Sequence, residues 1–182
     1  KSTLINTLAG RTIAKTGNEP AVTQSQQRIN LGNNLILFDT PGLLWPKVEN
    51  DNSGYRLAIS GAIKDTAFNF DELAYYAAEY LLRFYPDNLI RRYSLEELPR
   101  DETTLLEIIG RQRGCLMNGG HVNLNKTSAI FINEFRDGTL GPISLETPDM
   151  MQKELRHVAQ LLTEKAEKKA ARLSAHKKGR KK

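Results

Sequence analysis

The chain has 182 residues and a single cysteine, so it can hold one ordinary domain or one domain plus part of another, and it cannot form an internal disulfide. No apolar run approaches the roughly 20 residues that a bilayer-spanning helix needs, which excludes a membrane-spanning class. Hydrophobic residues make up 40% of the chain and charged residues 26%, which is enough apolar material for a packed core. The lone Cys115 suits a reducing compartment and indicates a cytoplasmic protein.

The net charge of +5 is unevenly distributed along the chain. Residues 164–182 contain nine Lys and Arg residues against two Glu, so this tail carries +7 and the rest of the chain sums to −2. A nearly neutral body with a cationic tail predicts a polyanionic partner, most often nucleic acid. The alternative is a solvated terminus that binds nothing specific.

The first part of the chain has an α/β pattern. Residues 2–9 have helical spacing, with Leu4, Ile5 and Leu8 on one side. A polar loop over residues 16–27 follows, and a strand is predicted over residues 27–31. The apolar run Leu35–Phe38 predicts the second strand of a hairpin, buried on both faces like an interior strand of an α/β sheet.

From Tyr55 onward the apolar spacing is helical. Residues 49–54 are predicted as a loop before it. The predicted helices cover residues 55–65, 71–84, 89–93, 101–113 and 127–136, and a last helix runs from about Asp149 into the basic tail. The pattern therefore divides the chain into an α/β region (residues 1–64), an all-helical region (residues 65–162) and a basic tail (residues 163–182).

The first residues match the second half of a Walker A phosphate loop, GxxxxGK[ST]. Lys1 fits the lysine that neutralises the β- and γ-phosphates, and Ser2 fits the hydroxyl that binds Mg²⁺. The helix that begins there, with Thr3 in its first turn, would direct its N-terminus at the phosphates. Alone, this triplet is a weak signal, because a charged residue before a helix cap is common.

A second element, Asp39-Thr40-Pro41-Gly42, strengthens the prediction because it matches the DxxG element of a GTPase. Asp39 ends a strand and can hold Mg²⁺ through water, and the Gly42 amide can approach the γ-phosphate. Thr23, in the polar loop between the two elements, is the candidate switch threonine that binds Mg²⁺ in the GTP state. The order of these elements predicts a partial P-loop GTPase domain, of α/β class, followed by an all-α domain.

The motif that reads guanine, NKxD, does not follow the DxxG element. The one candidate, Asn125-Lys126-Thr127-Ser128, lacks the Asp and runs into a predicted helix, where Asn125 is better read as the cap. We therefore expect the base-reading motif to precede Lys1 in a longer protein, which would make the motif order circularly permuted.

At this point the sequence resembles a known family, the circularly permuted ribosome-assembly GTPases of the YlqF/RbgA type. The resemblance rests on KSTLINTLAG (1–10), PAVTQSQQ (20–27), DTPGLLWPK (39–47), GAIKD (61–65), Ile108–Arg111, Gly114, Gly119-Gly120 and FRDGTLG (135–141). It implies GTP or GDP and Mg²⁺ as cofactors, with K⁺ as a candidate monovalent ion, and a helical C-terminal domain that contacts rRNA. It also implies GTP hydrolysis coupled to late maturation of the large ribosomal subunit. The sequence gives no sign of membrane contact, and no obligate protein partner is inferred from it. The sequence departs from the family at Ala21, where a glycine is usual, and the family's base-reading motif is not among these 182 residues.

The position after the DxxG element bears on hydrolysis. Many GTPases place a Gln there to orient the attacking water, whereas this chain has Leu43. A leucine cannot orient water, so no catalytic side chain is assigned. We expect slow intrinsic hydrolysis that a partner accelerates.

The candidate RNA-binding residues are cations near helix ends and in the tail. They are Arg91, Arg92, Arg111, Arg113, Lys177, Lys178 and Arg180. Arginine suits phosphate groups, although ordinary surface charge has the same appearance in a sequence. Two other functions stay open: a helical RNA-binding module with a non-functional nucleotide-site remnant, and a P-loop ATPase.

Overall fold

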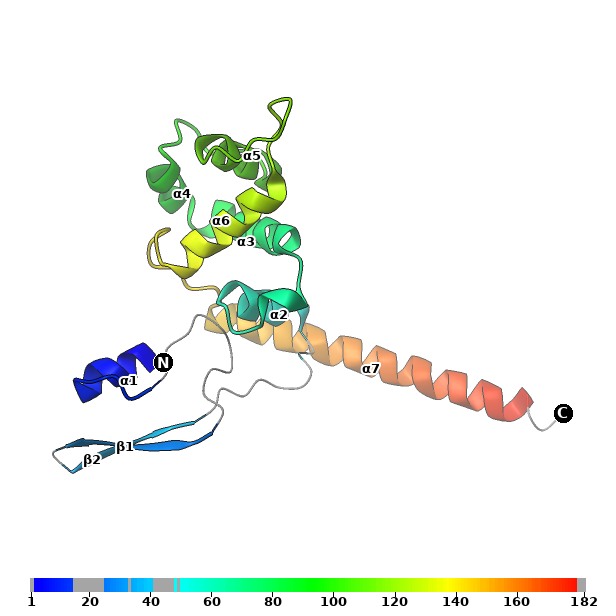
Figure 1. Ribbon diagram of the computed structural model, residues 1–182. Coiled ribbons are helices and arrows are strands. Elements are labelled where there is room, and N and C mark those ends of the chain that lie inside the picture. Colours follow the sequence, from blue (N-terminus) through cyan, green and yellow to red (C-terminus); the bar gives the residue numbers. More distant parts are fainter. Residues whose placement is uncertain (1, 15–24, 33, 41–47, 49, 180–182) are drawn as a thin grey trace. The chain divides into compact units, whose positions relative to one another are not determined.

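The computed structural model describes residues 2–14, 25–32, 34–40, 48 and 50–179 (Figure 1). A helix and an antiparallel hairpin come first: α1 (Ser2–Ala9), β1 (Gln27–Gly32) and β2 (Leu35–Asp39). Helices follow: α2 (Asp51–Ile59), the short 3₁₀ helix η1 (Asp65–Ala67), α3 (Phe70–Phe84), α4 (Pro86–Tyr93), α5 (Glu102–Gln112), α6 (Leu124–Arg136) and α7 (Pro148–Gly179).

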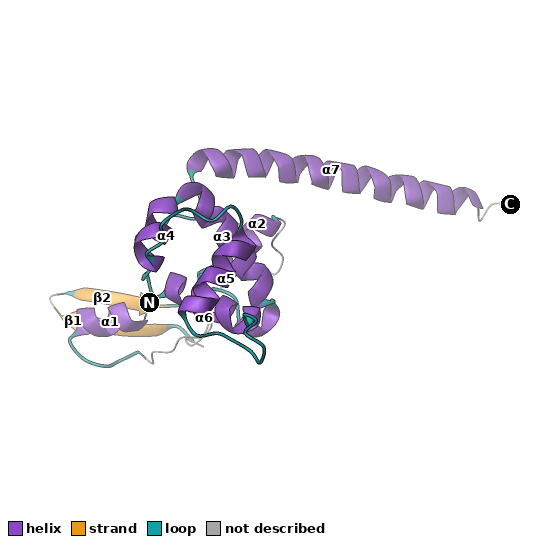
Figure 2. Cartoon of the chain, turned by 90° about the horizontal axis from the view of Figure 1, so that it is seen from above, coloured by secondary structure: helices purple, strands orange, loops and turns teal. Residues whose placement is uncertain are grey.

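The helix α1 packs against one face of the hairpin, as seen in Figure 2. Their small core consists of Ile5, Ala14 and Ile29, with Ile13, Leu31 and Leu37 packed against it. Asn6 holds the chain that returns from α1, because its Oδ1 accepts from the Ile13 and Ala14 amides at 2.9 and 2.8 Å. Its Nδ2 donates to the Ala14 carbonyl at 2.9 Å. The predicted helix and hairpin are thus confirmed, and α1 is fixed to the hairpin.

The prediction that the second strand is buried on both faces is wrong for the part of the chain that the structure describes. Leu35, Ile36 and Phe38 are 62%, 44% and 55% exposed. The described sheet has two strands only, so β2 has no further neighbour there and one face of the hairpin is uncovered. Leu4 and Leu8 of α1, predicted on its apolar side, are also exposed, at 62% and 57%.

The helix after the DxxG segment lies earlier than predicted. Its first residues were expected in a loop, but the Asn50 side chain accepts from the Asn52 amide at 3.1 Å and caps the N-terminus of α2. The helix ends at Ile59 instead of continuing to Asp65. Gly61, with φ +74°, turns the chain there in the left-handed conformation that terminates helices.

Helices α3 to α6 form one bundle, in which α3 packs against α4, α5 and α6, and α5 against α6 (Figures 1 and 2). Its fully buried side chains include Leu73, Leu81, Leu105, Leu106, Leu89, Ile109, Phe131 and Ile132. The predicted helices of this region are confirmed, with shifted ends. Phe84 lies in the last turn of α3 and is 46% exposed.

The cap of α6 is Asn123 and not the predicted Asn125. The Asn123 side chain accepts from the Lys126 amide at 3.0 Å, so the helix begins three residues before Thr127. Asn125 is then an exposed residue of the first turn.

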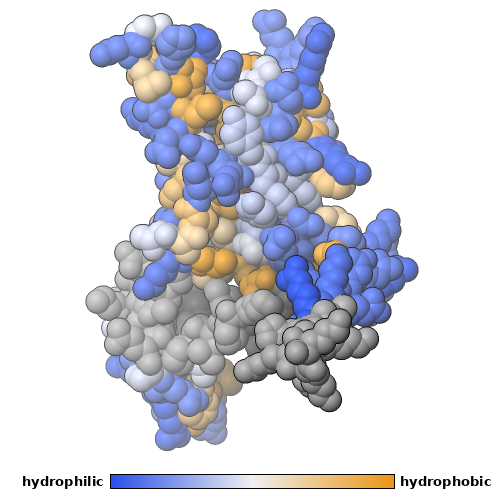
Figure 3. Space-filling model, turned by 90° about the vertical axis from the view of Figure 1, so that its right-hand side faces the viewer, coloured by the Kyte–Doolittle hydropathy of each residue, from blue (hydrophilic) through white to orange (hydrophobic). Residues whose placement is uncertain are grey.

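Helix α7 is one unbroken helix in both views and continues into the basic tail as far as Gly179 (Figures 1 and 2). By internal contacts the chain divides into Lys1–Pro46 with Tyr55–Pro142, and Lys47–Gly54 with Ile143–Lys182. In the second unit, Glu154 of α7 accepts from the side-chain amides of Asn50 and Asn52 at 2.6 and 3.2 Å. These units differ from the predicted limits at 64 and 162, since α7 crosses residue 162 without a break. None of the described helices is long and apolar enough to span a membrane, and Figure 3 shows the hydropathy of the residues on one face of the molecule.

Candidate nucleotide-binding site and arginine cluster

The N-terminus of α1 supplies one side of the candidate phosphate site. Ser2 is the first residue of the helix and is half-buried, and Thr3 follows and is exposed. The first amides of a helix have no partner within the helix, so together with the helix dipole they favour an anion. Ser2 and Thr3 thus lie in the first turn of α1, and their roles in Mg²⁺ and phosphate binding stay predictions.

The end of β2 supplies the second side. Asp39 is the last residue of the strand, opposite Gln27, and is 2% exposed. Because side chains alternate along a strand, Asp39 shares the face of Leu37, which packs against the core that α1 covers. The carboxylate and α1 thus lie on the same side of the hairpin.

The donor atoms of these residues suit the ion that the sequence implies. A hydroxyl and a carboxylate are hard oxygen ligands, which Mg²⁺ prefers, and a phosphate-bound Mg²⁺ takes its other ligands from the nucleotide and water. Among the described residues, no three His, Cys, Asp or Glu side chains gather as a metal site of their own. Lys1, Thr23, Gly42 and Leu43 lie outside the described residues, so Ser2, Thr3 and Asp39 are the predicted site residues that the structure places.

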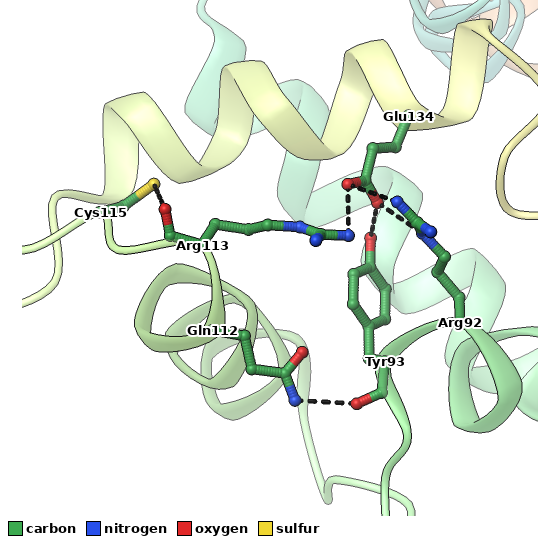
Figure 4. Close-up of polar contacts among 6 residues, drawn as sticks. All are labelled: Arg92, Tyr93, Gln112, Arg113, Cys115 and Glu134. Atoms are coloured by element: carbon green, nitrogen blue, oxygen red, sulfur yellow. Dashed lines mark hydrogen bonds and ion pairs between the residues drawn. The ribbon is translucent and has the colours of Figure 1, made fainter.

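Two of the predicted RNA-binding arginines meet at a carboxylate that the sequence analysis missed (Figure 4). Glu134 of α6 accepts from Arg92 Nε and Nη2 at 3.1 and 3.0 Å and from the Tyr93 hydroxyl at 2.9 Å. Arg113 Nη2 lies 2.6 Å from the same carboxylate. We call these four residues the arginine cluster. It joins the end of α4, the end of α5 and the third turn of α6.

The contacts within the arginine cluster shift the pKa values of Glu134, Arg92 and Tyr93. Burial raises the pKa of Glu134, but hydrogen bonds from Arg92 and Tyr93 and the charges of Arg113 and Arg92 outweigh burial, so the pKa is lowered. The hydrogen bond to Glu134 raises the pKa of Arg92. Burial, and then the charge of Glu134, raise the pKa of Tyr93 well above its ordinary value. The carboxylate stays ionised, and the two cations and one anion leave a net charge of +1.

The other cationic candidates differ in their surroundings. Arg91 is exposed and donates to Asn88 Oδ1 at 2.7 Å, and Arg111 is exposed at the end of α5. Lys177 and Lys178 belong to α7, and Arg180 lies outside the described residues. The structure therefore brings Arg92 and Arg113 together and keeps Arg91 and Arg111 apart from their carboxylate.

Arg136, in the FRDGTLG segment, has a structural role. Its Nε and Nη2 donate to the carbonyls of Ile59 and Ala58 at 3.1 and 2.9 Å, at the end of α2. The same guanidinium pairs with Asp65 at 2.9 Å and lies over the Phe70 ring at 5.9 Å. This one side chain closes the C-terminus of α2 and ties it to α6. The available sequence signal for this contact was that Asp65 and Arg136 both lie in segments that carry the family resemblance, GAIKD (61–65) and FRDGTLG (135–141).

Comparison with known proteins gives consistent matches. Residues 1–81 match the family model described as 50S ribosome-binding GTPase. The chain is 48% identical over 155 residues to the ribosome biogenesis GTPase A of Priestia megaterium, a match that covers 85% of this chain and 54% of that protein. It is 46% identical over 161 residues to the protein of the same name from Bacillus cereus, covering 88% and 54%. The chain thus spans about half the length of the curated relatives it matches.

A solved structure supports the fold. The GNP-bound YlqF from T. maritima superimposes with a TM-score of 0.53 at 23% identity, over 82% of this chain and 55% of that one. At this identity the likeness concerns the fold alone.

Proposed function

Because the chain belongs to the YlqF/RbgA family of ribosome biogenesis GTPases, we propose that the whole protein binds GTP with Mg²⁺ and hydrolyses it during assembly of the large ribosomal subunit. The GTP state would favour binding to the cytoplasmic pre-ribosome, and hydrolysis would favour release. The observation that carries the proposal is the placement of Ser2 at the start of α1 and buried Asp39 on the side of the hairpin that α1 covers.

Each residue of the site has a proposed task. Lys1, Thr3 and Gly42 would bind the phosphates, and Ser2 and Thr23 would bind Mg²⁺ directly, with Asp39 acting through water. The ion supplies positive charge to the β- and γ-phosphates. Since no base-reading motif follows Gly42, we propose a circularly permuted order in which that motif precedes the phosphate loop.

The proposed RNA contacts follow the charges. Arg91, Arg92, Arg111 and Arg113 lie at the ends of α4 and α5, and rRNA is the proposed ligand. Arg92, Arg113 and Glu134 together carry a net charge of +1. We therefore expect the two arginines to contribute less to RNA affinity than two unpaired arginines would. Lys177, Lys178 and Arg180 would add contacts from the tail.

A titration of the full-length protein with a fluorescent GTP analogue tests the nucleotide site. Replacing Ser2 by Ala removes a proposed Mg²⁺ ligand, and Asp39→Asn removes a charge, so each should weaken Mg²⁺-dependent GTP binding by roughly 10- to 100-fold. Thr7→Ala is the matched control on α1, because the Thr7 hydroxyl is exposed and bonds only to its own helix at Thr3 O in the described contacts. It should bind GTP as the parent does.

Two outcomes would contradict the assignment. One is GTP binding by Ser2→Ala and Asp39→Asn equal to that of the parent. The other is binding that EDTA leaves unchanged.

A second candidate function is an RNA-binding helical module whose nucleotide site is a remnant. The exposed cations of α7 favour it. It requires RNA affinity that is the same with GTP, with GDP and without nucleotide, whereas the leading proposal requires GTP and GDP to differ.

A further inference from the structure

The C-terminal half of α7 carries cations on one side of the helix. Lys165, Lys168, Lys169 and Arg172 stand at positions i, i+3, i+4 and i+7, which share one face at 3.6 residues per turn. All four are exposed, as is every residue from 161 to 170. Glu164 and Glu167 fall outside this face. We call the four residues the cationic stripe.

This arrangement is unfavourable for a helix in isolation. Lys165 neighbours Lys168 and Lys169, and Arg172 neighbours the same two, so like charges occupy neighbouring i+3 and i+4 positions. The same cations spread around the helix would repel one another less. A helix that places like charges side by side, although they repel, is typical of a binding surface, because a bound anion removes the repulsion.

The residue types between the cations of the stripe indicate which kind of anion it binds. A helix that lies on a membrane presents bulky apolar residues beside its cations. Between Lys165 and Arg172 the other residues are Ala and Glu, and no aromatic residue occurs from Pro148 to Lys182. The stripe spans about 10 Å along the helix axis at 1.5 Å per residue. Such a row of cations, with no bulky apolar residue between its first and last member, matches a row of backbone phosphates.

We propose that Lys165, Lys168, Lys169 and Arg172 form a phosphate-binding stripe that docks α7 along the backbone of double-stranded RNA. The proposal rests on the proposed function, because that function makes ribosomal RNA the source of the duplex. Phosphate contacts position a protein and carry no sequence information. The stripe therefore adds affinity and orientation, and it leaves sequence choice to other parts of the protein.

The test uses the full-length protein and a 20-base-pair RNA duplex of mixed sequence, with fluorescence anisotropy over a range of salt concentrations. One variant replaces all four stripe residues by Gln, which has a similar helix propensity. The matched variant keeps composition and net charge but breaks the stripe: Glu164→Lys, Lys165→Glu, Glu167→Lys and Lys168→Glu. Circular dichroism checks that α7 stays helical.

The Gln variant should bind the duplex at least about tenfold more weakly, and its slope of log K against log salt should be shallower by about 3 to 4, one unit for each lost phosphate contact. The charge-swapped variant should show a comparable loss. If it binds as tightly as the parent, net charge and not the stripe determines binding, and the proposal fails. It also fails if the Gln variant keeps the parent's affinity and slope.

Two further measurements distinguish RNA binding by the stripe from membrane binding and from the proposed GTPase function. Vesicles containing phosphatidylserine replace the RNA in one arm, and tighter binding to vesicles than to RNA overturns the assignment. GTP binding is measured for every variant in the other arm and should equal that of the parent. A parent that binds RNA through the stripe but binds no GTP would contradict the proposed function alone, whereas a parent that binds GTP but no RNA would contradict the stripe.

Discussion

At the residue scale, Glu134 is the member of the arginine cluster on which the others depend. Its side chain is 14% exposed, accepts hydrogen bonds from Arg92 and Tyr93, and forms an ion pair with Arg113. Glu134→Gln removes the charge and leaves two guanidinium groups beside a neutral amide. We expect the free energy of unfolding to fall by about 2–3 kcal/mol, because partners of a mostly buried ion pair lose their compensation. Chemical denaturation of parent and variant at pH 7 measures the difference.

The pH dependence of that difference has a definite sign. The pKa of Glu134 is lowered in the folded protein, so its contribution to stability is complete above the ordinary carboxyl range and is lost as the pH falls through the lowered pKa. Parent and Glu134→Gln should therefore approach each other in stability from pH 7 toward pH 3. Glu107→Gln, on the exposed side of α5, is the control and should differ little from the parent at any pH. A gap that stays constant with pH would disprove the ionic role.

At the element scale, the approach of α5 to α6 depends on Gly110. A Cβ on Gly110 would lie 2.6 Å from Thr127 Oγ1 and would also collide with Val122. Alanine favours a helix by about 1 kcal/mol over glycine, but overpacking costs about 1–3 kcal/mol, and here the crowding comes from two neighbours. We expect Gly110→Ala to lower the unfolding temperature.

Gly54 provides the matched helical control. It lies in α2, its φ is not positive, and no described heavy atom comes within 4 Å of a Cβ built there. Gly54→Ala should therefore stabilise the protein by roughly 0.5–1 kcal/mol. Thermal unfolding of both variants should give shifts of opposite sign, and equal signs would contradict the packing argument.

The elements also show where sequence reasoning succeeds and where it stops. Helix α3 follows from the spacing of its apolar residues and the hairpin from its turn, because both signals are local. Asn123 and Asn125 are equally good caps by residue type, and only the fold decides between them. Arg136 bonds to a carbonyl 77 positions away, so its letter alone cannot separate it from a surface arginine. Likewise, the exposure of β2 depends on which strands lie beside it.

At the scale of the whole molecule, the chain contains candidate residues for binding the phosphates of a nucleotide and a helical region. Its matched relatives are about twice as long. Ser2 and Asp39 belong to one candidate Mg²⁺-binding site, but neither is a candidate for activating the water that would attack GTP. The residue that often orients this water in GTPases corresponds to Leu43, which has no polar atom in its side chain. Under the proposed function, we therefore expect the group that orients the water to come from another part of the protein or from its partner.

GTP turnover by the full-length protein should therefore be slow alone and faster by at least about tenfold with large ribosomal subunit particles, because a group supplied from outside can complete a GTPase site. Release of inorganic phosphate, measured with and without the particles, gives both rates. Asp39→Asn is the control for binding, since it should reduce turnover in both conditions by weakening GTP binding. Fast turnover by the parent without particles would show that the protein itself carries the water-orienting group, and Leu43 would then carry no information about the rate.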